Sequence, residues 1–173
     1  RSCLCGGIQR AKGTEARAAL ITDHWDYIDR FDDTLVARGP VLNSDLTTQV
    51  IGSIHILDLP DWNAARDFAY EEPYAKAGLF DNIVLRRFKN QTGRTQFQFD
   101  GTPAHPRFFL YCAAAGAPSE TLAQDHEDYC RKFDAHFICR GPLLNDDGEW
   151  AGAAFFVEFP DDADMTSFLN NEP

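Results

Sequence analysis

Two histidines in this chain each have a glutamate at nearly the same distance further along. His24 lies 48 residues before Glu72, and His126 lies 46 residues before Glu172. A neutral imidazole is a competent general base near pH 7, and a carboxylate bonded to its second nitrogen fixes the tautomer and stabilises the charged form. Each pair is therefore a candidate His–Glu dyad for proton transfer. The alternative is a structural core histidine beside a helix-capping glutamate, and the recurrence of both residues favours the dyad.

Other polar side chains near these pairs are candidates for holding a substrate. Tyr27 and Tyr129 each follow a histidine by three residues and could orient a substrate hydroxyl, although a tyrosine on an apolar helix face more often packs in the core. Ser53 could hydrogen-bond a ligand, and we expect it to bind rather than to attack as a nucleophile. Asp26 and Asp128 are expected on solvated helix faces.

The residues around the histidines recur as a long repeat. The stretch Asp23-His24-Trp25-Asp26-Tyr27 returns 102 residues later as Asp125-His126-Glu127-Asp128-Tyr129. After the turns at Gly39-Pro40 and Gly141-Pro142 the offset falls to 100. Self-similarity at a fixed period indicates duplicated structural units. We interpret the chain as a tandem duplication.

Each copy has an order of elements that could bring its histidine and glutamate together. In the first, a helix over residues 14–32 carries His24 on its apolar stripe. Strands are expected at 34–38, 51–59 and 83–88, the first of these ending at the Gly-Pro turn, and Asp61 caps a second helix. A first strand within residues 1–10 is expected to be poor, because Gly6-Gly7 falls inside it.

This order is β-α-β-β-α-β, the ferredoxin-like arrangement, in which both helices cover one face of the sheet. The sequence therefore predicts an α+β protein with a first unit at 1–90, a linker at 91–106 and a second unit at 107–173. The second unit stops at Glu172-Pro173 without its last strand, and we expect truncation there. The opening Arg1 indicates a processed or incomplete start.

Composition excludes several classes of function. The net charge of −11 argues against a nucleic-acid backbone or an anionic membrane as partner, and no apolar run is long enough to span a bilayer. Five cysteines without a regular framework indicate reduced thiols in a cytoplasmic protein. No dinucleotide fingerprint occurs, and His55 lies in a strand without further ligands nearby. We expect no metal and no cofactor.

The motifs together resemble the YciI-like (YCII-related) family. They are the His-x-x-Tyr helix, the Gly-Pro turn, the Gly52-Ser53 strand start, and the segment Glu72-Pro73-Tyr74-Ala75-Lys76-Ala77-Gly78-Leu79-Phe80, where the family usually has Asp-Pro-Tyr. Cys3-Leu4-Cys5-Gly6 also resembles the start of glutathione-dependent formaldehyde-activating zinc domains, but the further cysteine pairs that those domains need do not follow.

The YciI-like resemblance implies ferredoxin-like units that pair sheet to sheet as a dimeric α/β barrel, here as an internal pseudo-dimer. It also implies a His–acid site, and relatives include dehydrochlorinases of hydroxylated aromatics. We expect a cofactor-free lyase or isomerase acting on a small hydroxylated, aromatic substrate, with His24–Glu72 as the first site, His126–Glu172 as a second or degenerate one, and Tyr74 as a further substrate-binding candidate. The alternative is a non-catalytic ligand-binding or accessory protein. Further association into a homo-oligomer is compatible with either.

Overall fold

The computed structural model describes residues 2–9, 14–43, 49–114 and 116–173, and these form two compact units. Unit 1 spans residues 1–87 and unit 2 spans residues 88–173. Residues 1 and 10 of the expected first strand lie outside the described residues.

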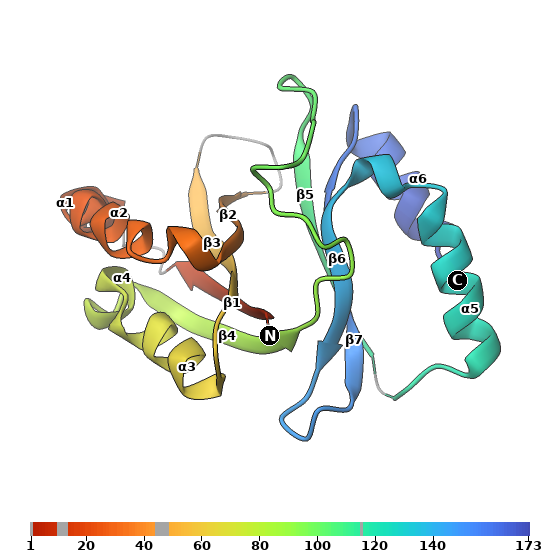
Figure 1. Cartoon of the computed structure of the whole chain (residues 1–173). Coiled ribbons are helices and arrows are strands. Elements are labelled where there is room, and N and C mark those ends of the chain that lie inside the picture. Colours follow the sequence, from red (N-terminus) through yellow and green to blue (C-terminus); the bar gives the residue numbers. More distant parts are fainter. Residues whose placement is uncertain (1, 10–13, 44–48, 115) are drawn as a thin grey trace. The chain divides into compact units, whose positions relative to one another are not determined.

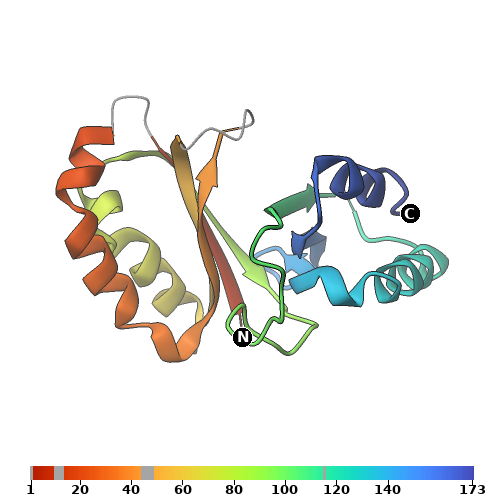
Figure 2. The ribbon, with the colours of Figure 1, turned by 90° about the horizontal axis from the view of Figure 1, so that it is seen from above.

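Unit 1 is a four-stranded antiparallel sheet with helices on one face. The strands are β1 (Ser2–Gln9), β2 (Leu35–Leu42), β3 (Val50–Asp58) and β4 (Phe80–Phe88), in the spatial order β2-β3-β1-β4. The helices are α1 (Thr14–Ala19), α2 (Ile21–Asp29), α3 (Trp62–Glu71) and α4 (Pro73–Lys76), with a 3₁₀ turn at Asp32–Thr34. Figures 1 and 2 show all four helices on the same side of this sheet. The strand order and the helix placement are those of a ferredoxin-like fold.

Two helices of unit 1, α3 and α4, begin at a residue whose side chain caps them. Asp61 is the N-cap of α3 and accepts a hydrogen bond from the backbone N–H of Ala64 at 2.8 Å, which confirms the expected cap. The long first helix expected over 14–32 is divided at Leu20 into α1 and α2. The apolar side of α2 still enters the core, with Tyr27 and Ile28 packed against Phe68 and Leu57.

Strand β1 is better formed than the sequence predicts. It pairs with β3 on one side and with β4 on the other, and the ladder continues through Gly6 and Gly7. Hydrogen bonds from two neighbours offset the conformational cost of glycine in a central strand. A Cβ at Gly7 would lie 2.8 Å from the ring of Phe80, so the missing side chain makes room for that ring.

Strand β2 also runs past the Gly-Pro turn that was expected to end it. It continues to Leu42, and Pro40 pairs with Ser53 of β3. Proline is tolerated here because β2 lies at the edge of the unit 1 sheet, where its missing N–H interrupts no second ladder.

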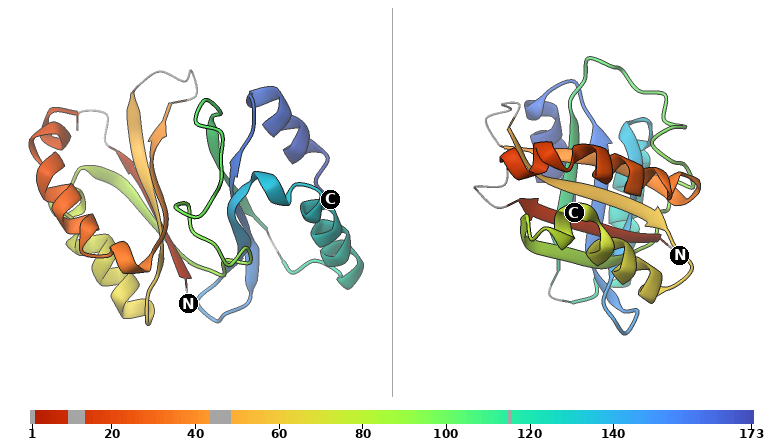
Figure 3. Two further views of the ribbon diagram at one scale, coloured as in Figure 1. Left: turned by 45° about the horizontal axis from the view of Figure 1, so that its top comes forward. Right: turned by 90° about the vertical axis from the view of Figure 1, so that its left-hand side faces the viewer.

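Unit 2 repeats the first five elements of this order. It contains β5 (Arg107–Ala113), α5 (Glu120–Arg131), a 3₁₀ turn at Asp134–His136, β6 (Phe137–Leu144), β7 (Trp150–Glu158) and α6 (Asp162–Asn170). The strand order is β6-β7-β5, and α5 and α6 cover one face of these strands (Figure 3). Ser119 caps α5 and Asp161 caps α6.

The segment expected to be a linker packs with unit 2. The Arg94 guanidinium donates to the carbonyl oxygen of Phe137 at 2.6 Å. Thr102 N–H and Arg107 Nε donate to the buried carboxylate of Glu158, at 2.6 and 3.1 Å. These bonds hold the segment on the second unit over most of its length. Over the described residues, no helix is long and apolar enough to cross a membrane.

Candidate active sites

The first predicted pair is formed in unit 1. His24 Nδ1 lies 2.6 Å from Glu72 Oε1, and both residues are 4% exposed. Helix α2 supplies the histidine, and the glutamate stands between α3 and α4, where its second oxygen, Oε2, accepts from Ala75 N–H at 3.0 Å. The Glu72 side chain therefore caps α4 and orients the imidazole at the same time. With Nδ1 directed at the carboxylate, Nε2 is the nitrogen left to take a proton.

Tyr74 covers this pair. Its ring is stacked on His24 with centroids 4.3 Å apart and an interplanar angle of 12°, and it is fully buried. The Arg17 guanidinium lies 4.6 Å from the centroid of the same Tyr74 ring. Among the described residues no hydrogen-bond partner reaches the Tyr74 hydroxyl. Burial raises the pKa of that hydroxyl, so it stays protonated.

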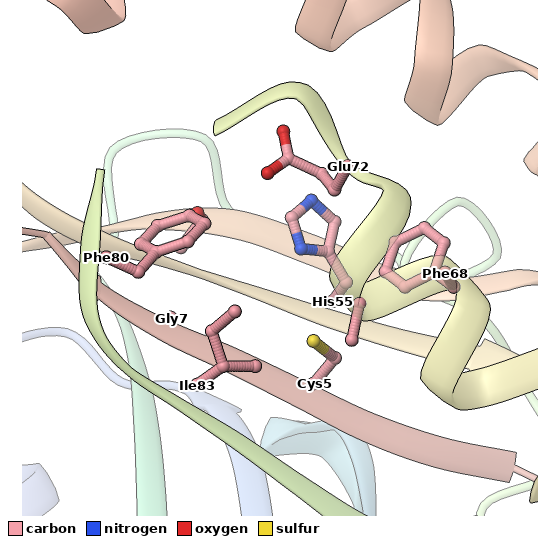
Figure 4. A pocket seen from close by; sticks show the side chains of 9 residues that line it. Cys5, Gly7, His55, Phe68, Glu72, Phe80 and Ile83 are labelled. Carbon is pink, nitrogen blue, oxygen red and sulfur yellow. The ribbon is translucent and has the colours of Figure 1, made fainter. Parts of the chain in front are cut away.

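The cavity beside Glu72 is small. It has a volume of about 20 Å³ and is lined by Cys5, Gly7, Ser53, His55, Phe68, Ala69, Glu72, Phe80 and Ile83. Figure 4 shows the Glu72 carboxylate and the His55 imidazole on one side of this space, with Phe80 and Phe68 to either side and Cys5 and Ile83 below. A cavity of this volume holds about one water molecule.

Sequence analysis placed His55 in a strand but did not count it among the site residues, and the structure places it in the lining of this cavity. It is buried, and its ring centroid lies 5.9 Å from that of His24. Burial lowers the pKa of His55 to about 3, with the neighbouring His24, Arg38 and Arg17 acting in the same direction. His55 is therefore neutral at physiological pH. Its position two residues after Ser53 on β3, and so on the same face, was the available signal.

The two tyrosines of the repeat contact the backbone rather than either cavity. Tyr27 donates to the carbonyl oxygen of Phe68 at 3.1 Å, and Tyr129 donates to that of Phe168 at 2.8 Å. Each hydroxyl thus links the two main helices of its unit, which favours the packing alternative for both. Ser53 is buried and lines the small cavity.

The second predicted pair is also formed. His126 Nδ1 is hydrogen-bonded to Glu172 Oε1, and the two side chains are 27% and 21% exposed. His126 Nε2 lies 3.7 Å from the Sγ of Cys130, one turn further along α5. A thiol is a weak donor, and burial raises the pKa of Cys130 to about 11, so the thiol stays protonated. The Nε2 lone pair is only weakly engaged.

A much larger cavity adjoins this pair. Its volume is about 420 Å³, within the range of small-molecule sites. The polar residues lining it are His126, Glu172, Glu127 and Gln91. The walls are mostly apolar and comprise Cys112, Ala113, Ala114, Pro118, Leu122, Ala123, Pro142, Trp150, Ala153, Phe155 and Pro173.

The two cavities occupy corresponding places in the two units. Gly7 pairs with Ser53 in unit 1, and Cys112 pairs with Ala153 in unit 2, so these strand positions are equivalent, and both pairs line the cavities. In unit 1 the rings of Tyr74 and Phe80, which follow the glutamate in sequence, occupy the space beside the pair.

Glu127 and Gln91 are held in the wall of the larger cavity by a buried arginine. Arg140 donates to both oxygens of Glu127, at 2.8 and 3.1 Å, and to Gln91 Oε1 at 3.0 Å. The hydrogen bonds from Arg140 lower the pKa of Glu127, so it is ionised at neutral pH. Sequence analysis missed all three residues, because they come from a loop, a helix and a strand. Within the described part of the chain, no group of three or more metal-ligating side chains occurs.

Together these features define a class: ferredoxin-like α+β proteins that carry a histidine–carboxylate pair between helix and sheet. The model of the YCII-related domain matches residues 3–89, half of the chain, and the protein belongs to this family. The match covers unit 1, so the duplication into unit 2 stays a prediction. No curated protein matches the sequence.

Several solved structures are similar to the chain, and two of them indicate its fold. One is 5-chloro-2-hydroxyhydroquinone dehydrochlorinase from Burkholderia phenoliruptrix in complex with 2,5-dihydroxybenzoquinone, at 23% identity and a TM-score of 0.50, covering 54% of this chain and 99% of that one. The other is a mutant chlorite dismutase from Candidatus Nitrospira defluvii, at 10% identity and a TM-score of 0.63, covering 98% and 80%. At these identities the likeness supports the fold alone.

Proposed function

We propose that the protein is a lyase or isomerase that moves protons on a small hydroxylated aromatic substrate by means of a His–Glu dyad. His126–Glu172 is the working pair, and His24–Glu72 is a second pair of the same geometry. Pairing of the two units as a pseudo-dimer of the dimeric α/β-barrel type remains part of this proposal.

The observation that carries the proposal is the same Nδ1–carboxylate contact in both units, next to a cavity in each. The contact leaves Nε2 as the basic nitrogen and stabilises the imidazolium that forms when it takes a proton. We assign turnover to His126 because 420 Å³ accommodates an aromatic ring, whereas 20 Å³ does not.

The reaction class we favour is loss of hydrogen chloride from a chlorinated polyhydroxybenzene. His126 takes a proton from a ring hydroxyl, and a proton is delivered to the carbon that bears chlorine. Chloride then leaves with the electron pair of the carbon–chlorine bond as a second hydroxyl loses its proton, giving a hydroxyquinone. The ring is oxidised at its oxygens and reduced at the former chlorine-bearing carbon, so no external oxidant is needed. Support comes from the family and from the dehydrochlorinase among the similar structures.

The second candidate function is ligand binding without turnover. One observation favours it: Nε2 of His126 lies within reach of the Cys130 thiol, and a base must turn from that contact toward its substrate. The cavity itself serves either function equally well.

A pair of matched variants separates these functions. Purified protein is assayed with chlorinated hydroxyquinols and with lactones, by chloride release and by quinone absorbance. His126→Gln is expected to lower kcat by at least about 100-fold, the usual contribution of a general base, with substrate affinity changed only a few-fold. His24→Gln is the control and is expected to keep most of the activity.

Binding without turnover by the unaltered protein would refute the enzymatic proposal and leave the binding function. Loss of turnover in His24→Gln alone would move the chemistry to unit 1.

A further inference from the structure

We propose that Glu127, fixed by Arg140, and the Gln91 amide beside it form a polar anchor that makes the unit 2 cavity selective for neutral rings with two or more hydroxyl groups. This inference rests on the proposed function, since it concerns the same cavity. It adds which residues recognise the ligand and which chemical class they admit.

Arg140 gives this anchor a fixed geometry. Arg140 is 7% exposed, and its guanidinium binds both oxygens of Glu127, a bidentate arrangement that sets the position and the plane of the carboxylate. A carboxylate has about four acceptor positions, so positions remain for a ligand on each oxygen. Gln91 Oε1 accepts from the same guanidinium, and its backbone N–H bonds to the Arg140 carbonyl at 2.8 Å. The Gln91 amide nitrogen, with its two donors, remains for the ligand.

The anchor is particular to unit 2. The repeat offset of 102 places Trp25 opposite Glu127 and Arg38 opposite Arg140. In unit 1 the Arg38 guanidinium lies 5.0 Å from the Trp25 ring centroid and pairs with the exposed Asp29 carboxylate at 3.5 Å, so the residue at the position of Glu127 is an indole and not a carboxylate. At this one helix position, unit 2 thus has a hydrogen-bond acceptor in the wall of the larger cavity where unit 1 has an indole.

The charges around the cavity determine which ligands fit. Glu127 and Glu172 both line it, and the carboxylate of a benzoate, which has acceptors and no donor, cannot hydrogen-bond to either of them. Ring hydroxyls are donors that a carboxylate accepts strongly, and Leu122, Phe155 and Trp150 offer apolar surface to the ring. One hydroxyl reaching Glu127 and another reaching His126 would orient the ring for proton removal.

Cys112 provides a direct readout of occupancy, because it lines the same cavity and is partly exposed. The other four cysteines are buried and serve as internal controls. The native protein is treated with iodoacetamide at pH 8.5, without oxygen, and alkylation of Cys112 is followed by mass spectrometry. The probes are 1,2,4-trihydroxybenzene, phenol and benzoate.

Trihydroxybenzene is expected to protect Cys112 at concentrations at least about tenfold lower than phenol, and benzoate is expected not to protect. Glu127→Gln should weaken protection by trihydroxybenzene by about tenfold, the loss typical of a hydrogen bond to a charged group. Asp128→Asn is the matched control: it removes a carboxylate from the next position of α5, where the side chain is exposed and bonded to Arg131. It should leave protection unchanged.

Three results would overturn the inference: equal protection by phenol and trihydroxybenzene, protection by benzoate, or equal behaviour of the two variants. Protection by a peptide of residues 73–80 in place of trihydroxybenzene would also overturn it, by identifying a protein segment as the occupant. If Glu127→Gln lowers the unfolding temperature, Gln91→Met tests the same anchor with the Glu127–Arg140 pair intact.

Failure of the inference and failure of the proposed function are distinguishable. Protection of Cys112 without turnover refutes the enzymatic function and supports the anchor. Turnover that is indifferent to Glu127→Gln refutes the anchor and keeps the enzyme.

Discussion

Single residues at equivalent positions give the two units different properties. His55 and Phe155 occupy the same register position of β3 and β7, yet one is a titratable group and the other an apolar ring. Ser53 and Ala153 also occupy equivalent positions, and only the serine is polar. The polar residues of the first cavity surround a space for about one water, whereas those of the second border a much larger cavity.

His55 predicts a measurable pH dependence of stability. The native state keeps it neutral, with a pKa of about 3, while the unfolded chain protonates it near pH 6.5. Below pH 6.5 the unfolded state binds more protons, so the free energy of unfolding falls with falling pH, by up to about 1.4 kcal/mol per unit until about pH 3. Above pH 6.5 this contribution is fully present.

The measurement is urea unfolding at pH 7.5, 6, 5 and 4. His55→Phe introduces the residue found at this position in unit 2. It should make the free energy of unfolding less dependent on pH between pH 6.5 and 4, by the equivalent of about one proton taken up on unfolding. An unchanged slope in this variant would show that His55 does not titrate on unfolding.

Replacing the glutamate of each His–Glu pair by glutamine should lower the free energy of unfolding by different amounts, because the two pairs differ in burial. Glu72 is buried and bonded to both His24 and Ala75, so Glu72→Gln should lower the free energy of unfolding by about 3 kcal/mol, as for a broken buried pair. Glu172→Gln should cost about 1 kcal/mol, since its side chain and that of His126 are partly exposed. Equal losses in the two variants, measured by urea unfolding at pH 7.5, would contradict the difference in burial.

At the scale of elements, the contact between β1 and β4 decides how closed the first cavity is. Phe80, the first residue of β4, places its ring over Gly7 of β1. The centroid of this ring lies 6.3 Å from that of Tyr74, and the two rings meet edge to face. The segment after Glu72 therefore seals the space beside the dyad.

Neighbouring glycines of β1 provide a matched test of this contact. Gly7→Ala should lower the free energy of unfolding by about 1–3 kcal/mol, because its Cβ would lie 2.8 Å from the Phe80 ring. Gly6→Ala is the control, since nothing lies within 4 Å of a Cβ there. Gly7→Ala combined with Phe80→Ala should cost less than the sum of the two single changes in a double-mutant cycle. Additive costs would rule out the proposed steric conflict.

At the scale of the whole molecule, each unit has its own core. The first core is built around Ile28, Leu57 and Phe68, and the second around Phe137, Phe155 and Phe168. The segment before β5 is part of the second unit, held largely by the buried Glu158 carboxylate.

Glu158→Gln is therefore expected to loosen residues 99–107 specifically. It removes the charge that accepts from Thr102 and Arg107, and limited proteolysis within that segment should accelerate several-fold. Asp58→Asn is the control, since Asp58 is the repeat equivalent in unit 1 and is exposed. Unchanged cleavage in Glu158→Gln would mean that other contacts hold the segment.

The sequence by itself predicted the order of elements and the cap at Asp61, and it placed each histidine and its glutamate where the two could meet. These follow from local propensity and from the repeat, which constrain the chain one element at a time. Its weakest expectations were the first strand and the Gly-Pro strand ends, where ladder partners outweighed the local preferences of glycine and proline.

Only the tertiary structure decided which pair has room beside it. Cavity volume depends on side chains that arrive from other elements, and beside the first pair these include Tyr74 and Phe80. The tertiary structure also brought Gln91, Glu127 and Arg140 together from a loop, a helix and a strand. A hydrogen-bond network between distant segments exists only once those segments have packed.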